Sequence, residues 1–372
     1  MVWRWRASHH DRLRAGALPF SIVQNVQSKL VSVIVVCSNA KEHLPACLES
    51  LHRQTYPNVE VMVVDNGSTD GTREYVESAH TWVRIHSTGT NLGYGPANNA
   101  AFSIAAGDYL AVLNPDTEVH PDFVTGLVDA IEQEGAGLAT SRICFFDDRR
   151  LVNACGNEIH LTAIGYCRGM GEPMERFDTN AQVASISGCA FMIRRDVIAR
   201  IGGFDDDYFM YAEDTDLSIR ANLAGDRIVF APRSIVYHKY SLKMTPGKFF
   251  LLERNRRQTL IKNLRWTTLV ALLPVIWMTG VLMWVYAIVH GPEYLRAKFR
   301  AQVWIYRNWS LILAKRRRVQ TLRKVGDREV LRLLSSTLPA DQVIGPGLFG
   351  RLAGLPMNLV YRVLAVPVRI VG

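Results

Sequence analysis

Residues 31–72 have the sequence VSVIVVCSNAKEHLPACLESLHRQTYPNVEVMVVDNGSTDGT, and this stretch decides the fold. The runs 31–37 and 59–64 are apolar and β-branched, which is typical of strands buried on both faces. Between them, 44–51 has the spacing of an amphipathic helix, which ends before Pro57. The second run ends in a turn rich in Asp and Gly, a common start for a helix. The stretch therefore predicts strand, helix, strand and helix in succession.

The same alternation continues along the chain. We expect a helix to about Ser78, a strand at 82–86, a helix at 96–106 and a strand at 109–113. This order predicts an α/β fold with a mainly parallel sheet covered by helices. Ligands of such sheets bind beyond the carboxyl ends of the strands. The polar residues at these ends are Ser38 and Asn39, then Asp65 and Asn66, then Asn114 and Asp116.

Composition divides the 372 residues into three parts and restricts the partners. The net charge of +9 predicts an anionic partner, such as nucleotide phosphates, acidic lipid or nucleic acid. The six cysteines form no C-x-x-C pair, which argues against zinc and for buried thiols in a reducing compartment. Basic residues dominate 243–265, and 266–289 then contains no charge. We predict a basic and aromatic extension at 1–29, an α/β domain at 30–245 and a helical, membrane-associated region at 246–372.

Three further phrases carry a resemblance to a known family. They are NLGYGPANNA (91–100), LNPDTEVHPDF (113–123) and SGCAFMIRRDVIARIGGFDDDYFMYAEDTDLSIRANLAG (187–225). Together with 31–72 they resemble family 2 glycosyltransferases, in their rhamnosyltransferase-like branch, from about residue 31 to 240. The resemblance implies the GT-A fold, a Rossmann-like mixed sheet. It also implies transfer of a sugar from a nucleotide-diphosphate donor to a hydroxyl group, with a divalent metal.

The resemblance also assigns the residues that bind the donor. Asp65 would hold the base or ribose of the nucleotide. The same pocket would be lined by Asn39, Asn66, Asn91, Gly93, Asn98 and Asn114. We expect Gly93 to let the backbone approach the ligand closely, since glycine has no Cβ.

A metal site is implied at the end of the fourth strand. Asp116 matches the last acid of the family's D-x-D motif, but Asn114 stands in the place of the first acid. His238 matches a histidine that binds the metal in some relatives; an isolated histidine is as often structural. We therefore expect Asp116 and His238, completed by substrate phosphates, to hold Mn²⁺ or Mg²⁺.

Glu213 and Asp214 are the candidates for the chemical step. From the residues alone, acids in the first turn of a helix are explained equally well by the helix dipole. The resemblance assigns the catalytic base to Asp214, which would take the proton of the acceptor hydroxyl in one inverting displacement. Asp216 is the rival base. We expect Glu213, Arg254 and Arg256 to contact the diphosphate or an anionic acceptor, with a solvated basic helix face as the alternative for the two arginines.

The uncharged run at 266–289 is long enough to span a bilayer, yet basic residues flank both of its ends. It is an interfacial or re-entrant segment, a true span or a buried core helix. The tryptophans around it favour a membrane interface. We predict a lipid-linked saccharide acceptor at the cytoplasmic face of the cell membrane, a part in cell-envelope polysaccharide synthesis and, as donor, a deoxythymidine diphosphate sugar such as rhamnose.

Two other functions have to be weighed. A processive polysaccharide synthase carries Q-x-x-R-W and several spans, whereas this chain has the R-W at 265–266 without the Gln. A non-catalytic sugar-nucleotide binding module would keep Asp65 and lose Asp214, and both are present. A nucleic-acid partner is not expected, because the basic residues bracket an apolar run and form no groove.

Overall fold

The computed structural model describes residues 28–240, 243–343 and 356–365. Its first four strands are β1 (Val31–Cys37), β2 (Val59–Asp65), β3 (Arg84–Ser87) and β4 (Tyr109–Leu113). They pair in parallel in the order β4-β1-β2-β3, with Val31 opposite Val59 and Tyr109. The predicted strands are therefore confirmed, and the third begins two residues later than expected.

The sheet continues beyond β4 with strands of mixed direction. They are β5 (Thr117–Val119), β6 (Leu138–Phe145), β7 (Val152–Cys155), β10 (Ala181–Gln182), β11 (Ala190–Arg194) and β12 (Ile228–His238). Strand β11 lies antiparallel between β4 and β6, and β12 runs parallel to β6. The order β10-β12-β6-β11-β4-β1-β2-β3 gives the mixed, mainly parallel α/β sheet that the sequence predicts.

Helices cover both faces of the sheet, because alternate residues of each buried strand point to opposite sides. Val33 and Val35 pack with α1 (Leu44–His52), α2 (Thr72–Ala79) and α4 (Phe123–Glu134). On the other face, Ile34 and Val36 pack with α3 (Tyr94–Ile104), α5 (Arg195–Ile201) and α6 (Glu213–Leu223). Helix α3 begins two residues before the predicted start, since Pro96 is tolerated within a first turn.

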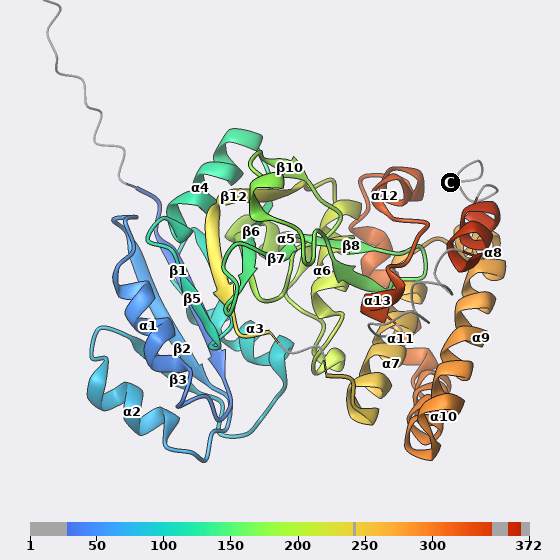
Figure 1. Ribbon diagram of the computed structural model, residues 1–372, viewed down its shortest axis with the longest axis horizontal. Helices are drawn as coiled ribbons and strands as arrows, with labels where there is room; N and C mark the ends of the chain where they lie inside the picture. Colours follow the sequence, from blue (N-terminus) through green and yellow to red (C-terminus); the bar gives the residue numbers. More distant parts are fainter. Residues whose placement is uncertain (1–27, 241–242, 344–355, 366–372) are drawn as a thin grey trace, which may run out of the picture.

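The C-terminal helices gather at the end of the molecule opposite β3, as Figure 1 shows. They are α7 (Pro246–Asn263), α8 (Trp266–Ala271), α9 (Leu273–His290), α10 (Pro292–Arg307), α11 (Trp309–Thr321), α12 (Asp327–Leu333), α13 (Ala340–Val343) and a helical segment at 356–365. Helix α7 packs against α6, α10 and α11, so it joins these helices to the sheet domain. The uncharged run 266–289 is not one helix, because the chain breaks at Leu272, before Pro274.

Helix α9 exposes an apolar face. This face comprises Leu273, Trp277, Val281, Val285 and Ile288. In the part of the chain that the structure describes, α9 alone is long and apolar enough to cross a membrane, and only 17% of its residues are buried. So little burial is unlike a core helix, which disfavours that reading of 266–289.

The predicted basic extension and the C-terminal region are described only in part. Of the extension at 1–29, the structure describes residues 28 and 29; of the region at 246–372, residues 344–355 and 366–372 lie outside the described residues.

The six cysteines are all free thiols, and five of them are buried, as expected for small residues of a core.

Candidate active site

Asp65, the last residue of β2, is fixed by donors from two neighbouring turns. Its Oδ1 accepts a hydrogen bond from the Ser68 amide at 3.0 Å, and its Oδ2 accepts one from Ser87 Oγ at 3.2 Å. The side chain is 4% exposed, at the carboxyl end of the parallel strands where this fold binds ligands. Asn39 lies nearby in the left-handed region, with φ 55°, and its Oδ1 accepts from the Thr69 amide at 2.8 Å.

Asn66 and Asn91 bind each other rather than standing free. Asn66 Nδ2 donates to Asn91 Oδ1 and to the Gly93 carbonyl oxygen, each at 3.2 Å. Asn91 in turn accepts from the Gly93 amide at 2.9 Å and donates to Ser38 Oγ at 3.3 Å. The two asparagines thus hold the loop before α3 against the ends of β1 and β2. The structure therefore brings Asn39, Asp65, Asn66, Asn91 and Gly93 together.

The expected role of Gly93 requires correction. Its φ is 92°, and a Cβ there would overlap the carbonyl oxygen of Phe209. The group that approaches this glycine closely is the chain's own backbone, not a ligand. Asn98 is fully buried within α3, where its Nδ2 donates to the Tyr94 carbonyl oxygen at 2.9 Å. Asn98 therefore stabilises α3 behind the expected nucleotide pocket and does not line that pocket.

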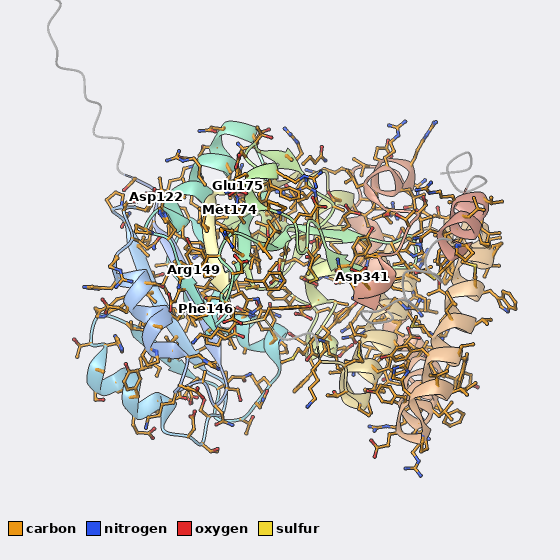
Figure 2. The ribbon with its side chains drawn as sticks, in the orientation of Figure 1. Asp122, Phe146, Arg149, Met174, Glu175 and Asp341 are labelled. Carbon is orange, nitrogen blue, oxygen red and sulfur yellow. The ribbon has the colours of Figure 1, made fainter. Side chains whose placement is uncertain are left out.

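Asp116 and His238 lie together at the end of β4. His238 Nδ1 donates to Asn153 Oδ1 at 3.1 Å, because an amide oxygen only accepts. This bond turns His238 Nε2 toward Asp116 Oδ1, 3.4 Å away. Asn153 was not predicted; a carbonyl partner on the second ring nitrogen is typical of metal-binding histidines. Phe146, whose amide donates to the His238 carbonyl oxygen, lies beside β12 in Figure 2.

The charges of this pair are complementary. Burial alone would lower the pKa of His238, but Cys189 and Asp116 outweigh burial and raise it to about 10. Burial would likewise raise the pKa of Asp116, and His238 lowers it below the usual range. Asp116 Oδ1 is buried and accepts no hydrogen bond from the described residues, so it is available to a cation. No cluster of three His, Cys, Asp or Glu side chains surrounds a common point in the described residues, so substrate oxygens would have to complete such a site.

Asp214 is positioned by the turn that precedes β11. Its Oδ2 accepts from the Gly188 amide at 3.1 Å and from Asn157 Nδ2 at 3.3 Å. Cys189, the next residue of this turn, accepts through its carbonyl oxygen from the Asn114 amide at 2.9 Å. The turn therefore connects the acid to the end of β4. Asn157 was also missed, since nothing in 141–186 distinguishes it from a surface polar residue.

Glu213 and Asp214 are neighbouring acids, and burial raises the pKa of both. Burial, and then the charge of Asp214, raise the pKa of Glu213 to about 8. Burial also raises the pKa of Asp214, but hydrogen bonds from Gly188 and Thr215 oppose this effect. Glu213 Oε2 has no hydrogen-bond partner among the described residues. Asp214, whose charged form alone receives hydrogen bonds from Gly188 and Thr215, is therefore better suited than Glu213 to act as the base.

The rival base Asp216 is fully buried in an ion-pair network. Its carboxylate lies 2.9 Å from Arg220 Nε and 3.1 Å from Lys262 Nζ, and it accepts from Asn263 Nδ2 at 2.8 Å. Burial opposes ionisation, but Lys262 and Arg220 outweigh burial and hold the pKa of Asp216 well below its usual range. A carboxylate that is fully paired and fully buried has no access to an acceptor hydroxyl.

Arg254 and Arg256 are engaged inside the chain. Arg254 Nη2 donates to the carbonyl oxygens of Asp207 and Tyr208, each at 2.7 Å. Arg256 lies 2.8 Å from Glu253, and both arginines are buried. This placement supports neither a diphosphate contact nor the alternative of a solvated basic face.

Asn255, between these arginines, holds the loop that leads into α6. Three residues of the loop have positive φ, namely Phe209, Tyr211 and Ala212. Asn255 Nδ2 donates to the carbonyl oxygens of Tyr208 at 3.1 Å, Met210 at 2.9 Å and Tyr211 at 2.7 Å. Residues other than glycine rarely adopt positive φ angles unless their surroundings impose them. Arg254 and Asn255 of the R-N-R run therefore hold the backbone of residues 207–211, the loop that positions Glu213 and Asp214.

Comparison with known proteins identifies relatives of this chain. Residues 32–202 match the model of the family described as "Glycosyl transferase family 2". The N-acetylglucosaminyl-diphospho-decaprenol L-rhamnosyltransferase of Mycobacterium tuberculosis is 31% identical over 237 residues, which cover 56% of this chain and 76% of the relative. Rhamnosyltransferase WbbL of Escherichia coli K12 is 25% identical over 224 residues, or 56% of this chain and 83% of WbbL.

Two solved structures share the fold. TarS 1–349 of S. aureus in complex with UDP-GlcNAc superimposes with a TM-score of 0.51 at 18% identity, over 90% of each chain. GalNAc-T7 with UDP, GalNAc and Mn²⁺ gives 0.52 at 16% identity, over 63% of this chain and 48% of GalNAc-T7. At these identities the likeness shows the GT-A fold alone. The family match, the curated relatives and the arrangement of Asp65, Asp116 and Asp214 together lead to one conclusion: the chain is a glycosyltransferase and belongs to glycosyltransferase family 2.

Proposed function

We propose that this enzyme transfers L-rhamnose, with inversion, from a deoxythymidine diphosphate donor to a hydroxyl group of a lipid-linked saccharide. The observation that supports the proposal is the setting of Asp214, a carboxylate that accepts a hydrogen bond from the turn before β11; the same turn is bonded to the end of β4. The sugar and acceptor follow the two curated relatives, which are named as rhamnosyltransferases; one is named for N-acetylglucosaminyl-diphospho-decaprenol.

The protein side chains perform the following steps. Asp65 and Asn39 bind the nucleoside, at strand ends where the neighbouring asparagines keep the loops in place. Asp214 removes the proton of the acceptor hydroxyl. The acceptor oxygen attacks the anomeric carbon of the donor sugar as the bond from this carbon to the diphosphate breaks. Glu213, whose pKa burial raises to about 8, is less suited than Asp214 to remove the proton. Because a single displacement suffices, the configuration at the anomeric carbon inverts.

Asp116 and His238 would hold Mn²⁺ or Mg²⁺, with Asn114 beside them. Asp116 Oδ1 accepts no hydrogen bond from the described residues and faces His238 Nε2. The pair would therefore fit a divalent ion that displaces the proton of His238 and is completed by donor phosphates. A bound ion would stabilise the negative charge of the departing diphosphate. The fold relative GalNAc-T7 is described with UDP and Mn²⁺, which supports a metal of this kind.

The acceptor would be presented at the cytoplasmic face of the membrane, in the synthesis of a cell-envelope polysaccharide. Support comes from the exposed apolar face of α9 and from exposed basic residues on the helices around it, among them Arg296, Arg300 and Arg317. Helix α9 lies at the end of the molecule beyond α7 (Figure 1).

A donor and acceptor screen tests the proposal. The full chain would be assayed with deoxythymidine diphosphate rhamnose, UDP-GlcNAc and GDP-mannose, each with and without Mn²⁺, on N-acetylglucosaminyl-diphospho-farnesol. We expect rhamnose transfer at least tenfold faster than transfer of either other sugar. Equal rates with all donors would refute the sugar assignment, and no turnover of any donor would favour the binding module. Formation of chains longer than one sugar would favour a processive synthase.

A further inference from the structure

A cavity of about 110 Å³ lies between α7, α9 and the loop before α6. Its wall includes Ala212, the neighbour of Glu213 in the chain, and Gly165, whose missing Cβ would lie 2.8 Å from Thr215 Oγ1. Since Thr215 follows Asp214, the cavity lies beside the helix start that carries the acid pair. It is separate from the strand ends that hold Asp65 and Asp116.

The lining of the cavity suits an apolar occupant. Helix α7 contributes Phe249 and Leu252, and α9 contributes Met283 and Tyr286. The polar residues of the wall are already paired. Arg256 lies 2.8 Å from Glu253, and Gln342 exchanges hydrogen bonds of 2.9 and 3.0 Å with the backbone of Cys167. None of these polar side chains has a buried atom without a partner in the described residues, so nothing there calls for a sugar or a nucleotide.

Lys248 is a cation without a counter-ion in the described residues, and it directly precedes Phe249 of the cavity wall. It belongs to the first turn of α7, and its ammonium lies 5.0 Å from the centre of the Tyr211 ring. Among the described residues its Nζ has no ion pair or hydrogen bond, and burial lowers its pKa. A half-buried ammonium of this kind gains most from an anionic ligand.

Lys248 and the acid pair lie at the same short loop. The Lys248 ammonium lies against the ring of Tyr211. Tyr211 is followed by Ala212, which lines the cavity, and then by Glu213 and Asp214. The ammonium is therefore beside the loop that connects the cavity wall to the acid pair.

We propose that the cavity binds the first isoprene unit of a prenyl-linked acceptor and that Lys248 binds the diphosphate next to it. This inference rests on the proposed function, because a prenyl-diphospho-saccharide carries a diphosphate between its sugar and its hydrocarbon chain. A dry cavity of about 150 Å³ holds one benzene-sized molecule. The smaller cavity here therefore suits one branched unit, and the remaining chain lies outside it, where α9 offers its exposed apolar face.

Binding of farnesyl diphosphate to the full chain tests the inference without any donor. Titration calorimetry below the aggregation concentration of this probe would compare it with inorganic pyrophosphate and with farnesol. We expect farnesyl diphosphate to bind at least tenfold more tightly than either. Lys248→Ala should remove the preference over farnesol, and Lys248→Arg should keep it. Met283→Trp, which fills the cavity, should weaken farnesyl diphosphate at least tenfold and leave pyrophosphate unchanged.

Leu311→Trp is the control, since it adds the same group at an exposed position of α11 that neither lines the cavity nor belongs to the apolar face of α9. Thermal unfolding of every variant shows whether it is folded. If Met283→Trp does not fold, Lys248→Ala still tests the inference. Equal affinity for farnesyl diphosphate and pyrophosphate in the wild type, or equal losses in Met283→Trp and Leu311→Trp, would overturn the inference. Rhamnose transfer is scored in a separate assay, so failure of the proposed function is recognised independently of this binding result.

Discussion

The side-chain amide of Asn255 donates a hydrogen bond of 2.7 Å to the carbonyl oxygen of Tyr211, two residues before Glu213. Helix α7 of the C-terminal region thereby holds the loop that positions Glu213 and Asp214 in the sheet domain. The same amide also binds Tyr208 and Met210, in a loop with three positive φ values. Asn255 is thus a positioning residue that touches neither donor nor acceptor.

Asn255→Ala should lower kcat at least tenfold and change the KM of the donor less than threefold, because the acid pair moves while the nucleotide pocket remains. Steady-state kinetics measures the split. Asn222→Ala is the control, since Asn222 donates one buried bond of 3.0 Å to the Ala184 carbonyl oxygen outside this loop. Equal losses of kcat in the two variants would mean that Asn255 acts through general stability.

Asp214→Asn should reduce transfer by about 10²–10⁴, the usual contribution of a general base. The Gly188 amide still finds an acceptor in the Asn side chain, so nucleotide affinity should change by less than about 1 kcal/mol. Single-turnover transfer and calorimetric binding of deoxythymidine diphosphate measure the two effects. Wild-type turnover in this variant would exclude Asp214 as the base.

Glu213→Gln should stabilise the protein more at pH 8 than at pH 5. The folded pKa of Glu213 is about 8, above the ordinary value of 4.5, so the folded state binds the extra proton between these values. The contribution of Glu213 to stability is therefore fully present below pH 4.5 and is lost as the pH rises toward 8. Glutamine removes this loss. Melting temperatures of the wild type and Glu213→Gln from pH 5 to 8 check this prediction. A difference in melting temperature that stays constant with pH would contradict the raised pKa of Glu213.

Lys262→Met should cost about 3 kcal/mol in the free energy of unfolding, because it removes a buried cation that two carboxylates share and leaves Asp216 with Arg220 and Asp205 with Lys315. Lys262 pairs with Asp205 and with Asp216, and its side chain is 1% exposed. Arg150→Met removes the exposed pair with Asp148 and should cost less than about 1 kcal/mol. Urea denaturation measures both values. Similar costs would show that the buried network contributes little.

Asn153→Ala should weaken Mn²⁺ binding about 10–100-fold, since it frees the ring of His238 to rotate and to change its tautomer. Asn114→Asp should tighten it, because the substitution restores the acid of the D-x-D pattern. Titration of Mn²⁺ by electron paramagnetic resonance, in the presence of deoxythymidine diphosphate, gives both affinities. Unchanged binding in both variants would place the metal elsewhere.

The strands and helices around Asp65 follow from local pattern, because buried parallel strands and their turns have clear signatures. The contacts of Asn153 with His238 and of Asn157 with Asp214 do not, since each joins segments far apart in the chain that meet only in the folded protein. The R-N-R run shows the same limit. Its basic composition suggested an anionic ligand, whereas the fold uses these side chains to bind backbone carbonyls.

The buried pairs of Lys262 and Lys315 with Asp205 have a consequence for how this enzyme is divided in the laboratory. A chain that stops near residue 245, where the composition changes, would keep three acids, Asp205, Asp207 and Asp216, and discard the lysines that neutralise them. Such a fragment retains every residue proposed to bind the nucleotide, yet Asp205 and Asp207 lose their lysines and Asp216 keeps Arg220 but loses Lys262. Truncations and chimaeras should therefore carry α7 through α11 with the sheet domain, as one inseparable folding unit.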